Sequence, residues 1–108
     1  MEDTIRALYE VVRDRKAHPQ EGSYTCYLFD QGLDKILKKC GEECSEVIIA
    51  AKNKNQEETI GEISDLLYHL TVLMVNEGIE LEAVEAVLAE RSRKIGNLKT
   101  FHVSDHNT

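Results

Sequence analysis

Carboxylate side chains recur at helical spacing in two segments of this sequence. Glu43 and Glu46 stand three residues apart in the first segment, and Glu62 and Asp65 stand three residues apart in the second. Residues three or four apart share one face of a helix, so each pair presents two carboxylates side by side. At about 100° per residue, both pairs lie along the edge of the apolar stripe of their own segment. Two antiparallel helices packed through these stripes would bring the pairs face to face.

Four carboxylates in one place repel each other unless a cation lies between them. Oxygen ligands without a Cys-x-x-Cys spacing or a helical Glu-x-x-His favour Mg²⁺ or Mn²⁺ over zinc or a di-iron centre. The alternative is a solvated helix face, which is the usual role of acidic runs. The carboxylates border the apolar stripe, and Glu62, Asp65 and His69 stand where a surface helix would carry salt-bridging Lys partners. The spacing alone leaves both interpretations open.

Apolar residues at steps of three and four predict the helices that position these carboxylates. Pro19 stops the first helix, and Ser23 is a suitable N-cap for a short helix that Gly32 ends. Asn55 and Glu58 resemble a capping box at the start of the second long helix. The expected helices span about residues 4–18, 23–31, 33–52, 56–77 and 81–93.

The order of these segments predicts the fold class. Because the connections are short and no strand-like alternation or repeat occurs, we expect an all-α bundle of about four to five helices. We expect one domain over residues 1–95 and a polar C-terminal tail over residues 96–108. So few helices cover their apolar stripes incompletely, which predicts a homodimer.

Composition narrows the possible partners. The net charge of −7 argues against nonspecific nucleic-acid binding, which needs a basic face, but an acidic protein binds an anionic nucleotide when metal cations stand between them. The three Cys residues form no metal-binding spacing and favour a reducing compartment. We expect a cytoplasmic protein, because the sequence shows no basic-then-apolar N-terminal segment and no long apolar run that would enter a membrane.

The pattern Glu-Glu-x-x-Glu, fifteen intervening residues and Glu-x-x-Asp resembles the signature of the MazG-like, all-α nucleoside triphosphate pyrophosphohydrolases. Within that superfamily, the wider context resembles the phosphoribosyl-ATP pyrophosphatases over about residues 4–95. The likeness is carried by Ser23-Tyr24-Thr25 with Leu28-Phe29 and Gly32, by Lys35-Ile36 and Lys38-Lys39-Cys40-Gly41-Glu42-Glu43-Cys44-Ser45-Glu46-Val47, by Glu62-Ile63-Ser64-Asp65-Leu66-Leu67-Tyr68-His69-Leu70, and by Leu88 and Arg91. Cys40 and Cys44 stand where many relatives have Val and Ala, and the tail after Arg91 departs from the family pattern.

The resemblance implies hydrolysis of phosphoribosyl-ATP to phosphoribosyl-AMP and pyrophosphate, the second step of histidine biosynthesis. It implies that the two carboxylate pairs hold Mg²⁺ and that Glu42 is a further ligand or the base that orients the attacking water. The substrate-side residues it implies are Ser23, Tyr24 and Thr25, whose hydroxyls would donate to ribose or phosphate, and Lys38, Lys39 and Arg91, which would meet phosphate oxygens.

Several of these residues also have a purely structural interpretation. Lys39 can pair with Glu43 at i+4, and Ser23 can act only as a helix cap. Arg91 can complement the C-terminal dipole of its helix, and His69 is a packed, hydrogen-bonded helix residue in this interpretation.

Two other functions remain open from the sequence. A sibling enzyme that cleaves noncanonical or deoxynucleotide triphosphates would share every metal ligand, and only the Ser-Tyr-Thr context argues against it. A non-enzymatic helical interaction module would need no buried acidic pairs.

Overall fold

The computed structural model describes residues 2–96, and the chain folds over that range into helices alone. This confirms the all-α class. The five helices of the described range are α1 (Glu2–Ala17), α2 (Tyr24–Gln31), α3 (Leu33–Lys52), α4 (Gln56–Asn76) and α5 (Leu81–Gly96). The last helix runs three residues past the expected end at Arg93 and includes Gly96. The rest of the expected tail, residues 97–108, lies outside the described residues.

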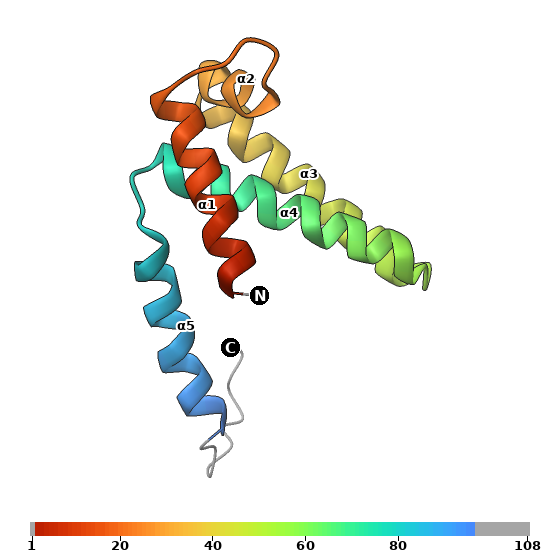
Figure 1. The fold of residues 1–108 in the computed structure, drawn as a ribbon. Helices are drawn as coiled ribbons and strands as arrows, with labels where there is room; N and C mark the ends of the chain where they lie inside the picture. The colour runs from red at the N-terminus through yellow and green to blue at the C-terminus, as the bar shows by residue number, and fades with distance from the viewer. Residues whose placement is uncertain (1, 97–108) are drawn as a thin grey trace.

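Two long antiparallel helices, α3 and α4, pack side by side and form what we call the arm (Figure 1). The helices α1 and α2 pack against one end of the arm, which leaves its other end, at the α3–α4 turn, projecting alone (Figure 1). The last helix, α5, leads away from the arm in a different direction (Figure 1). No helix in the part of the chain that the structure describes combines the length and the apolar character needed to span a membrane.

Local signals place the helix ends as the sequence predicts. The Ser23 Oγ accepts a hydrogen bond from the Cys26 N–H at 3.1 Å, and the Asn55 Oδ1 accepts one from the Glu58 N–H at 3.0 Å. Only this half of the capping box forms, because the Asn55 N–H donates to the Ala50 carbonyl and not to the Glu58 side chain. Gly32 separates α2 from α3 with φ of 94°, a left-handed conformation that favours glycine.

The core lies where α1 and α2 cover the end of the arm. Its buried apolar side chains come from all five helices: Tyr9, Val12, Leu28, Ile36, Val72, Val75 and Leu81. The Tyr9 hydroxyl donates to the Ile79 carbonyl at 2.9 Å, which fixes the α4–α5 connection against α1. The elements that position the acidic residues are therefore held from one end.

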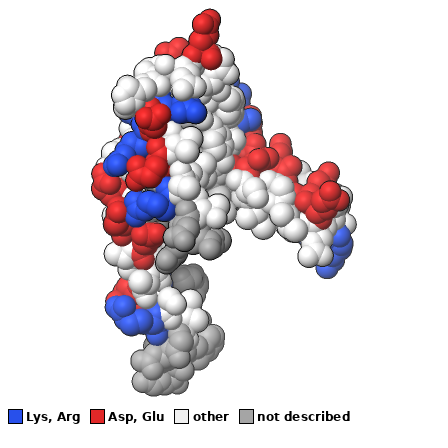
Figure 2. All heavy atoms as spheres, viewed as in Figure 1, with Lys and Arg blue, Asp and Glu red and all other residues white. Residues whose placement is uncertain are grey.

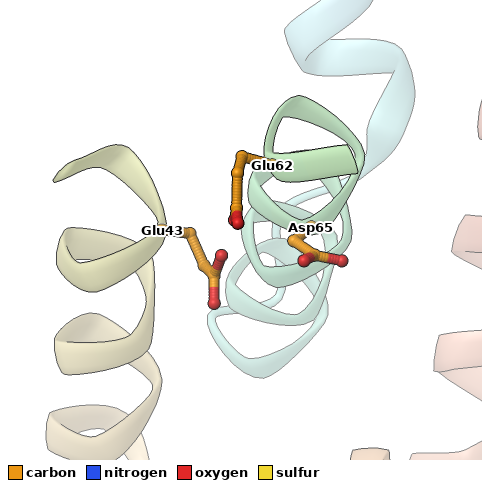
Figure 3. A group of neighbouring side chains, drawn as sticks. All are labelled: Glu43, Glu62 and Asp65. Atoms are coloured by element: carbon orange, nitrogen blue, oxygen red, sulfur yellow. The ribbon is translucent and has the colours of Figure 1, made fainter. Parts of the chain in front are cut away.

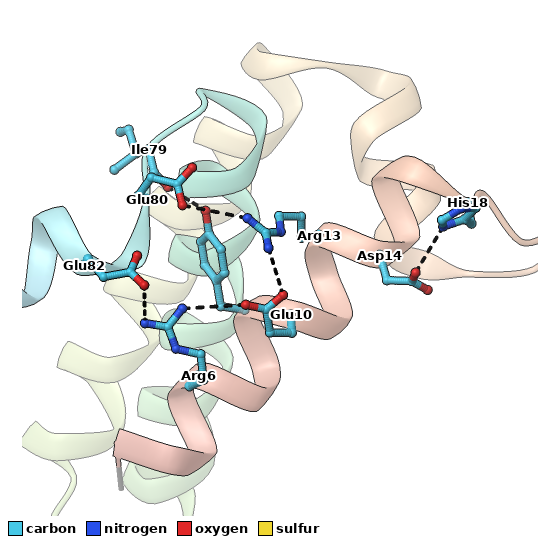
Figure 4. A network of polar contacts seen from close by, with 9 residues as sticks. Arg6, Glu10, Arg13, Asp14, His18, Ile79, Glu80 and Glu82 are labelled. Carbon is cyan, nitrogen blue, oxygen red and sulfur yellow. Dashed lines mark hydrogen bonds and ion pairs between the residues drawn. The ribbon is translucent and has the colours of Figure 1, made fainter.

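An exposed ion network joins α1 to the start of α5 (Figure 4). The Arg6 guanidinium lies 2.7 Å from Glu82 and 3.6 Å from Glu10, and Arg13 lies 3.2 Å from Glu10 and 3.8 Å from Glu80. Exposed pairs of this kind contribute at most about 1 kcal/mol each, so the network directs the first turn of α5 and adds little stability.

The end of the arm held by the core should depend on Leu28, whose side chain is fully buried. Leu28→Ala removes buried methyl groups and leaves a cavity, so we expect the free energy of unfolding to fall by about 2–5 kcal/mol. Chemical denaturation of the purified chain measures this loss. Leu37→Ala makes the same change on the exposed face of α3 and should cost much less; equal losses would place the core elsewhere.

Candidate active site

The arm brings carboxylates from both long helices together. Glu43 on α3 and Glu62 and Asp65 on α4 each offer a carboxylate oxygen, and these oxygens lie within 4.8 Å of one another. Figure 3 shows the three side chains meeting between the two helices, with Glu43 and Glu62 turned toward each other. We call these three residues the acidic cluster. The structure thus brings together three of the four carboxylates predicted to face each other.

Two oxygens of the acidic cluster are buried without a partner. Glu43 is 7% exposed, and among the described residues no hydrogen-bond donor reaches its Oε1 or the Oε1 of Glu62. A buried carboxylate oxygen normally has a hydrogen bond or a cation, because burial removes it from water. A cation bound between α3 and α4 would satisfy both oxygens at once.

The raised pKa of Glu62 also indicates a place where a cation would be favourable. Desolvation by its surroundings, together with the neighbouring carboxyl groups of Glu46 and Glu43, raises the pKa of Glu62 from 4.5 to about 7. The exposed Glu46 is therefore a neighbour of Glu62, although its oxygens lie outside the 4.8 Å group. The predicted fourth ligand stands at the rim of the acidic cluster.

The donor set fits a hard divalent cation. It consists of carboxylate oxygens alone, with no sulfur or imidazole nitrogen in the 4.8 Å group. Mg²⁺ and Mn²⁺ prefer such oxygen ligands, and Mg²⁺ usually keeps several waters when it is held by a few carboxylates. The residues could hold such an ion.

Lysine and glutamate side chains flank the acidic cluster along α3. The Lys39 Nζ lies 3.2 Å from the Glu42 Oε1 and 3.9 Å from the Glu43 Oε2, so the pairing at i+4 is confirmed. The hydrogen bond to Glu42 raises the pKa of Lys39. Lys39 thus offsets part of the negative charge at the rim, and Lys38 is exposed beside it. Their predicted contact with phosphate stays a prediction.

The Ser23-Tyr24-Thr25 segment starts α2 and faces α4. Besides the cap made by Ser23, the Tyr24 hydroxyl lies 3.0 Å from the His69 Nε2, and the hydroxyls of Thr25 and Tyr68 are hydrogen-bonded. His69 is 5% exposed, and its Nδ1 lies 2.8 Å from the carbonyl oxygen of Asp65. The interpretation of His69 as a packed, hydrogen-bonded helix residue is confirmed, and the same residue connects the acidic cluster to Tyr24.

A cavity of about 840 Å³ lies beside the α1–α2 connection. Its lining includes Arg15 and Lys16 from α1 and Ser23, Tyr24 and Tyr27 from the start of α2. We call it the loop cavity. Sequence reasoning missed Arg15 and Lys16, whose only signal was two adjacent basic residues in the last turn of a helix.

Arg91 is the predicted substrate-side residue that the structure does not bring to the others. It is exposed on α5, which leads away from the arm (Figure 1). Its predicted contact with phosphate stays a prediction.

Comparison with known proteins identifies the family of the chain. Residues 5–92 match the model of the phosphoribosyl-ATP pyrophosphohydrolase family. The chain belongs to this family.

Similar proteins include two single-activity relatives and one longer one. A phosphoribosyl-ATP pyrophosphatase of Clostridium botulinum (strain Kyoto / Type A2) is 58% identical over 97 residues, which cover 90% of this chain and 88% of that protein. One from Streptococcus sanguinis (strain SK36) is 51% identical over 102 residues, covering 94% and 98%. The histidine biosynthesis bifunctional protein HisIE of Lactococcus lactis subsp. lactis (strain IL1403) is 55% identical over 100 residues, covering 93% of this chain and 47% of that protein.

Replacing Glu62 by Gln should have two separate effects. It should relieve the repulsion among the carboxylates of the acidic cluster, and it should weaken Mg²⁺ binding. Because the pKa of Glu62 is raised in the folded state, its ionisation costs stability as pH rises above 4.5, and the cost is complete above about 7. At pH 8 without metal, Glu62→Gln should therefore raise the melting temperature, and at pH 5 it should have little effect. With Mg²⁺, the wild type should gain stability by mass action and the variant much less.

Thermal melts in chelator, Mg²⁺ and Ca²⁺ measure both effects. Glu57→Gln removes one charge from the exposed first turn of the same helix and should leave the Mg²⁺ response unchanged. An equal Mg²⁺ shift in the wild type and in Glu62→Gln would rule out a metal site at the acidic cluster.

Proposed function

We propose that this protein hydrolyses phosphoribosyl-ATP to phosphoribosyl-AMP and pyrophosphate in the cytoplasm, with Mg²⁺ as its cofactor and Mn²⁺ as a substitute. The observation that carries the proposal is the family match over residues 5–92, which includes the acidic cluster and the Ser23-Tyr24-Thr25 segment. The Lactococcus lactis relative is named for histidine biosynthesis, which supports a place for this reaction in that pathway.

The reaction needs charge neutralisation and an aligned water more than covalent help. Bound Mg²⁺ would supply the positive charge that offsets the phosphate oxygens. Glu43, Glu46, Glu62 and Asp65 would hold it, and their placement on two rigid helices keeps the ligands in register. This arrangement also explains how a chain with a net charge of −7 binds a polyanionic substrate.

The remaining roles go to residues at the rim of the acidic cluster. Glu42 would orient the attacking water or complete the ligand set, since it lies on α3 next to Glu43. The ion pair between Glu42 and Lys39 occupies both side chains. Substrate binding would therefore break this pair, and Lys39 would then contact phosphate while Glu42 contacts water. Lys38 would contact phosphate from the exposed side of the same turn.

Two alternatives are less well supported. A related pyrophosphatase of noncanonical or deoxynucleotide triphosphates would use the same ligands, but the relatives reported above are named for phosphoribosyl-ATP or histidine biosynthesis. A non-enzymatic interaction module gives no reason for buried carboxylate oxygens without partners. The phosphoribosyl-ATP activity therefore explains the most observations.

We also propose that the chain works as a homodimer. At the far end of the arm, four large apolar side chains are exposed: Ile48, Ile49, Ile60 and Ile63. A second apolar surface lies between the arm, α1 and α5, where a groove of about 570 Å³ is lined by residues such as Leu67, Met74, Val84 and Leu88. Figure 2 shows an uncharged area between the charged edge of the molecule and the acidic side chains of the arm. Contiguous apolar surface of this kind marks an interaction site.

The proposed activity predicts pyrophosphate release from phosphoribosyl-ATP that requires Mg²⁺ or Mn²⁺, with little release from ATP. Glu62→Gln should fold normally and lose roughly 100-fold or more in turnover, because charge stabilisation by a bound metal supplies several kcal/mol. Glu57→Gln should keep wild-type turnover. A coupled pyrophosphate assay with both substrates and a panel of deoxynucleotide triphosphates measures this. Faster cleavage of a deoxynucleotide triphosphate would favour the sibling enzyme, and full activity of Glu62→Gln would place the active site elsewhere.

The proposed dimer predicts a sedimenting species of twice the 12.3 kDa chain mass at micromolar concentration. Ile49→Lys puts a charge into the apolar surface at the far end of the arm and should shift the equilibrium toward the single chain. Val11→Lys places the same charge on an exposed position of α1 and serves as the control. A wild type that sediments only as the single chain contradicts the dimer.

A further inference from the structure

The hydrogen bonds of His69 determine where its ring proton lies. Its Nδ1 is 2.8 Å from the carbonyl oxygen of Asp65, and a carbonyl oxygen only accepts, so Nδ1 carries the hydrogen. In the tautomer that this bond selects, Nε2 carries the lone pair. The ring is buried and packs edge-on against Tyr68, at a centroid separation of 4.9 Å and an interplanar angle of 82°. His69 is therefore a fixed hydrogen-bond acceptor on α4.

Tyr24 meets this acceptor with its hydroxyl group. The Tyr24 oxygen lies 3.0 Å from the His69 Nε2, so the hydroxyl donates its hydrogen into the protein. The two rings are nearly perpendicular, at 80° and a centroid separation of 5.8 Å. The single O–H donor of Tyr24 is thus occupied by His69. A ligand can meet only the lone pairs of the Tyr24 oxygen, which accept hydrogen bonds.

Tyr24 also lies between the two parts of the candidate active site. It is 45% exposed and lines the loop cavity, while His69 joins it to the backbone of Asp65. Desolvation raises the pKa of Tyr24, and the nearby charges of Lys39 and Glu43 act on it in opposite directions. The hydroxyl therefore keeps its proton at neutral pH and stands at the boundary between the acidic cluster and the loop cavity.

We propose that Tyr24 binds the substrate as a hydrogen-bond acceptor for a ribose hydroxyl, and that His69 is the positioning residue that sets this polarity. A phosphate oxygen is itself an acceptor at neutral pH and does not match an acceptor on the protein. A sugar hydroxyl does match, and the sugar follows directly after the phosphates that the metal would hold. The proposal rests on the proposed function and replaces the donor role that the family resemblance implied for Tyr24.

The proton position can be tested without any activity. Nitrogen-15 NMR of the labelled full chain at neutral pH distinguishes the two tautomers of each histidine, and the His69→Gln spectrum assigns the signals of His69. We expect the tautomer with hydrogen on Nδ1. A hydrogen on Nε2, whether in the other tautomer or in a doubly protonated ring, would make Tyr24 the acceptor of that hydrogen and would overturn the proposal.

Tyr24→Phe removes only the hydroxyl and tests what it binds. We expect kcat/KM for phosphoribosyl-ATP to fall roughly two- to tenfold, the usual loss for one neutral hydrogen bond. Inhibition by inorganic tripolyphosphate in the presence of Mg²⁺ should be unchanged. Tripolyphosphate would bind the metal and fill the phosphate positions, but it has no hydroxyl to donate. Equal weakening of tripolyphosphate would show that Tyr24 serves phosphate, and no change for either ligand would show that it serves neither; both results overturn the proposal.

A double-mutant cycle tests the positioning role of His69. His69→Leu removes the acceptor for Tyr24, whereas the side-chain oxygen of His69→Gln can still receive the hydroxyl, so Gln should recover part of the loss. If His69 acts through Tyr24, His69→Leu should cost little further in kcat/KM when Phe already replaces Tyr24. Melting temperatures identify variants that fail to fold. If His69→Leu does not fold, the cycle is measured with His69→Gln in place of His69→Leu. Independent, additive losses would refute the positioning role.

These outcomes are separable from failure of the proposed function. A wild type that does not cleave phosphoribosyl-ATP would remove the proposed function, and the His69 tautomer would still report on the polarity of the pair.

Discussion

The carboxylates that meet between α3 and α4 repel one another, and the rest of the structure holds them at that separation. Glu43 is buried at the helix interface, and neither its Oε1 nor that of Glu62 has a hydrogen-bond partner in the described part of the chain. The free-energy cost of this repulsion is offset by apolar burial in the core, where α1 and α2 cover one end of the arm. Apolar burial at one end of the arm thus holds together carboxylates that repel one another, and an ion bound by them would meet ligands already in place. Preorganised ligands of this kind lose little free energy in reordering when they bind.

The same core also sets the polarity of the substrate side. The start of α2 packs against α4, so Tyr24 faces the helix that carries Glu62 and Asp65. His69 stands one turn after Asp65, which lets one imidazole bond to the backbone of a candidate ligand and to the hydroxyl of Tyr24. A change in the packing of α2 would therefore reach both Tyr24 and the backbone of Asp65 through His69. The loop cavity is lined by the same start of α2, so such a change would also alter its shape.

The sequence predicts the local structure well and the long-range contacts poorly. Periodic apolar residues, Pro19, Ser23 and Asn55 locate the helices because these signals act within a few residues. The facing of the acidic pairs was also predictable, because it follows from two helical phases and one antiparallel turn. The contact of Tyr24 with His69 spans 45 residues and depends on how α2 docks, which no spacing encodes. The position of Glu46 at the rim and the direction of α5 depend on packing angles, which the sequence pattern does not define.

The helix α5 leaves most of its apolar side chains uncovered. It spans Leu81–Gly96, and an isolated helix of this length is marginal in water, so it needs tertiary contacts. Of its described residues only Leu81 is buried, while Val87, Leu88 and Ile95 are exposed. The surface ion network at its first turn is too weak to compensate, since exposed pairs contribute about 1 kcal/mol or less. The far end of the arm has the same deficit, because Ile48, Ile49, Ile60 and Ile63 are exposed there. Both surfaces would be covered in the proposed dimer, which therefore accounts for the exposed apolar residues of α5 and of the arm.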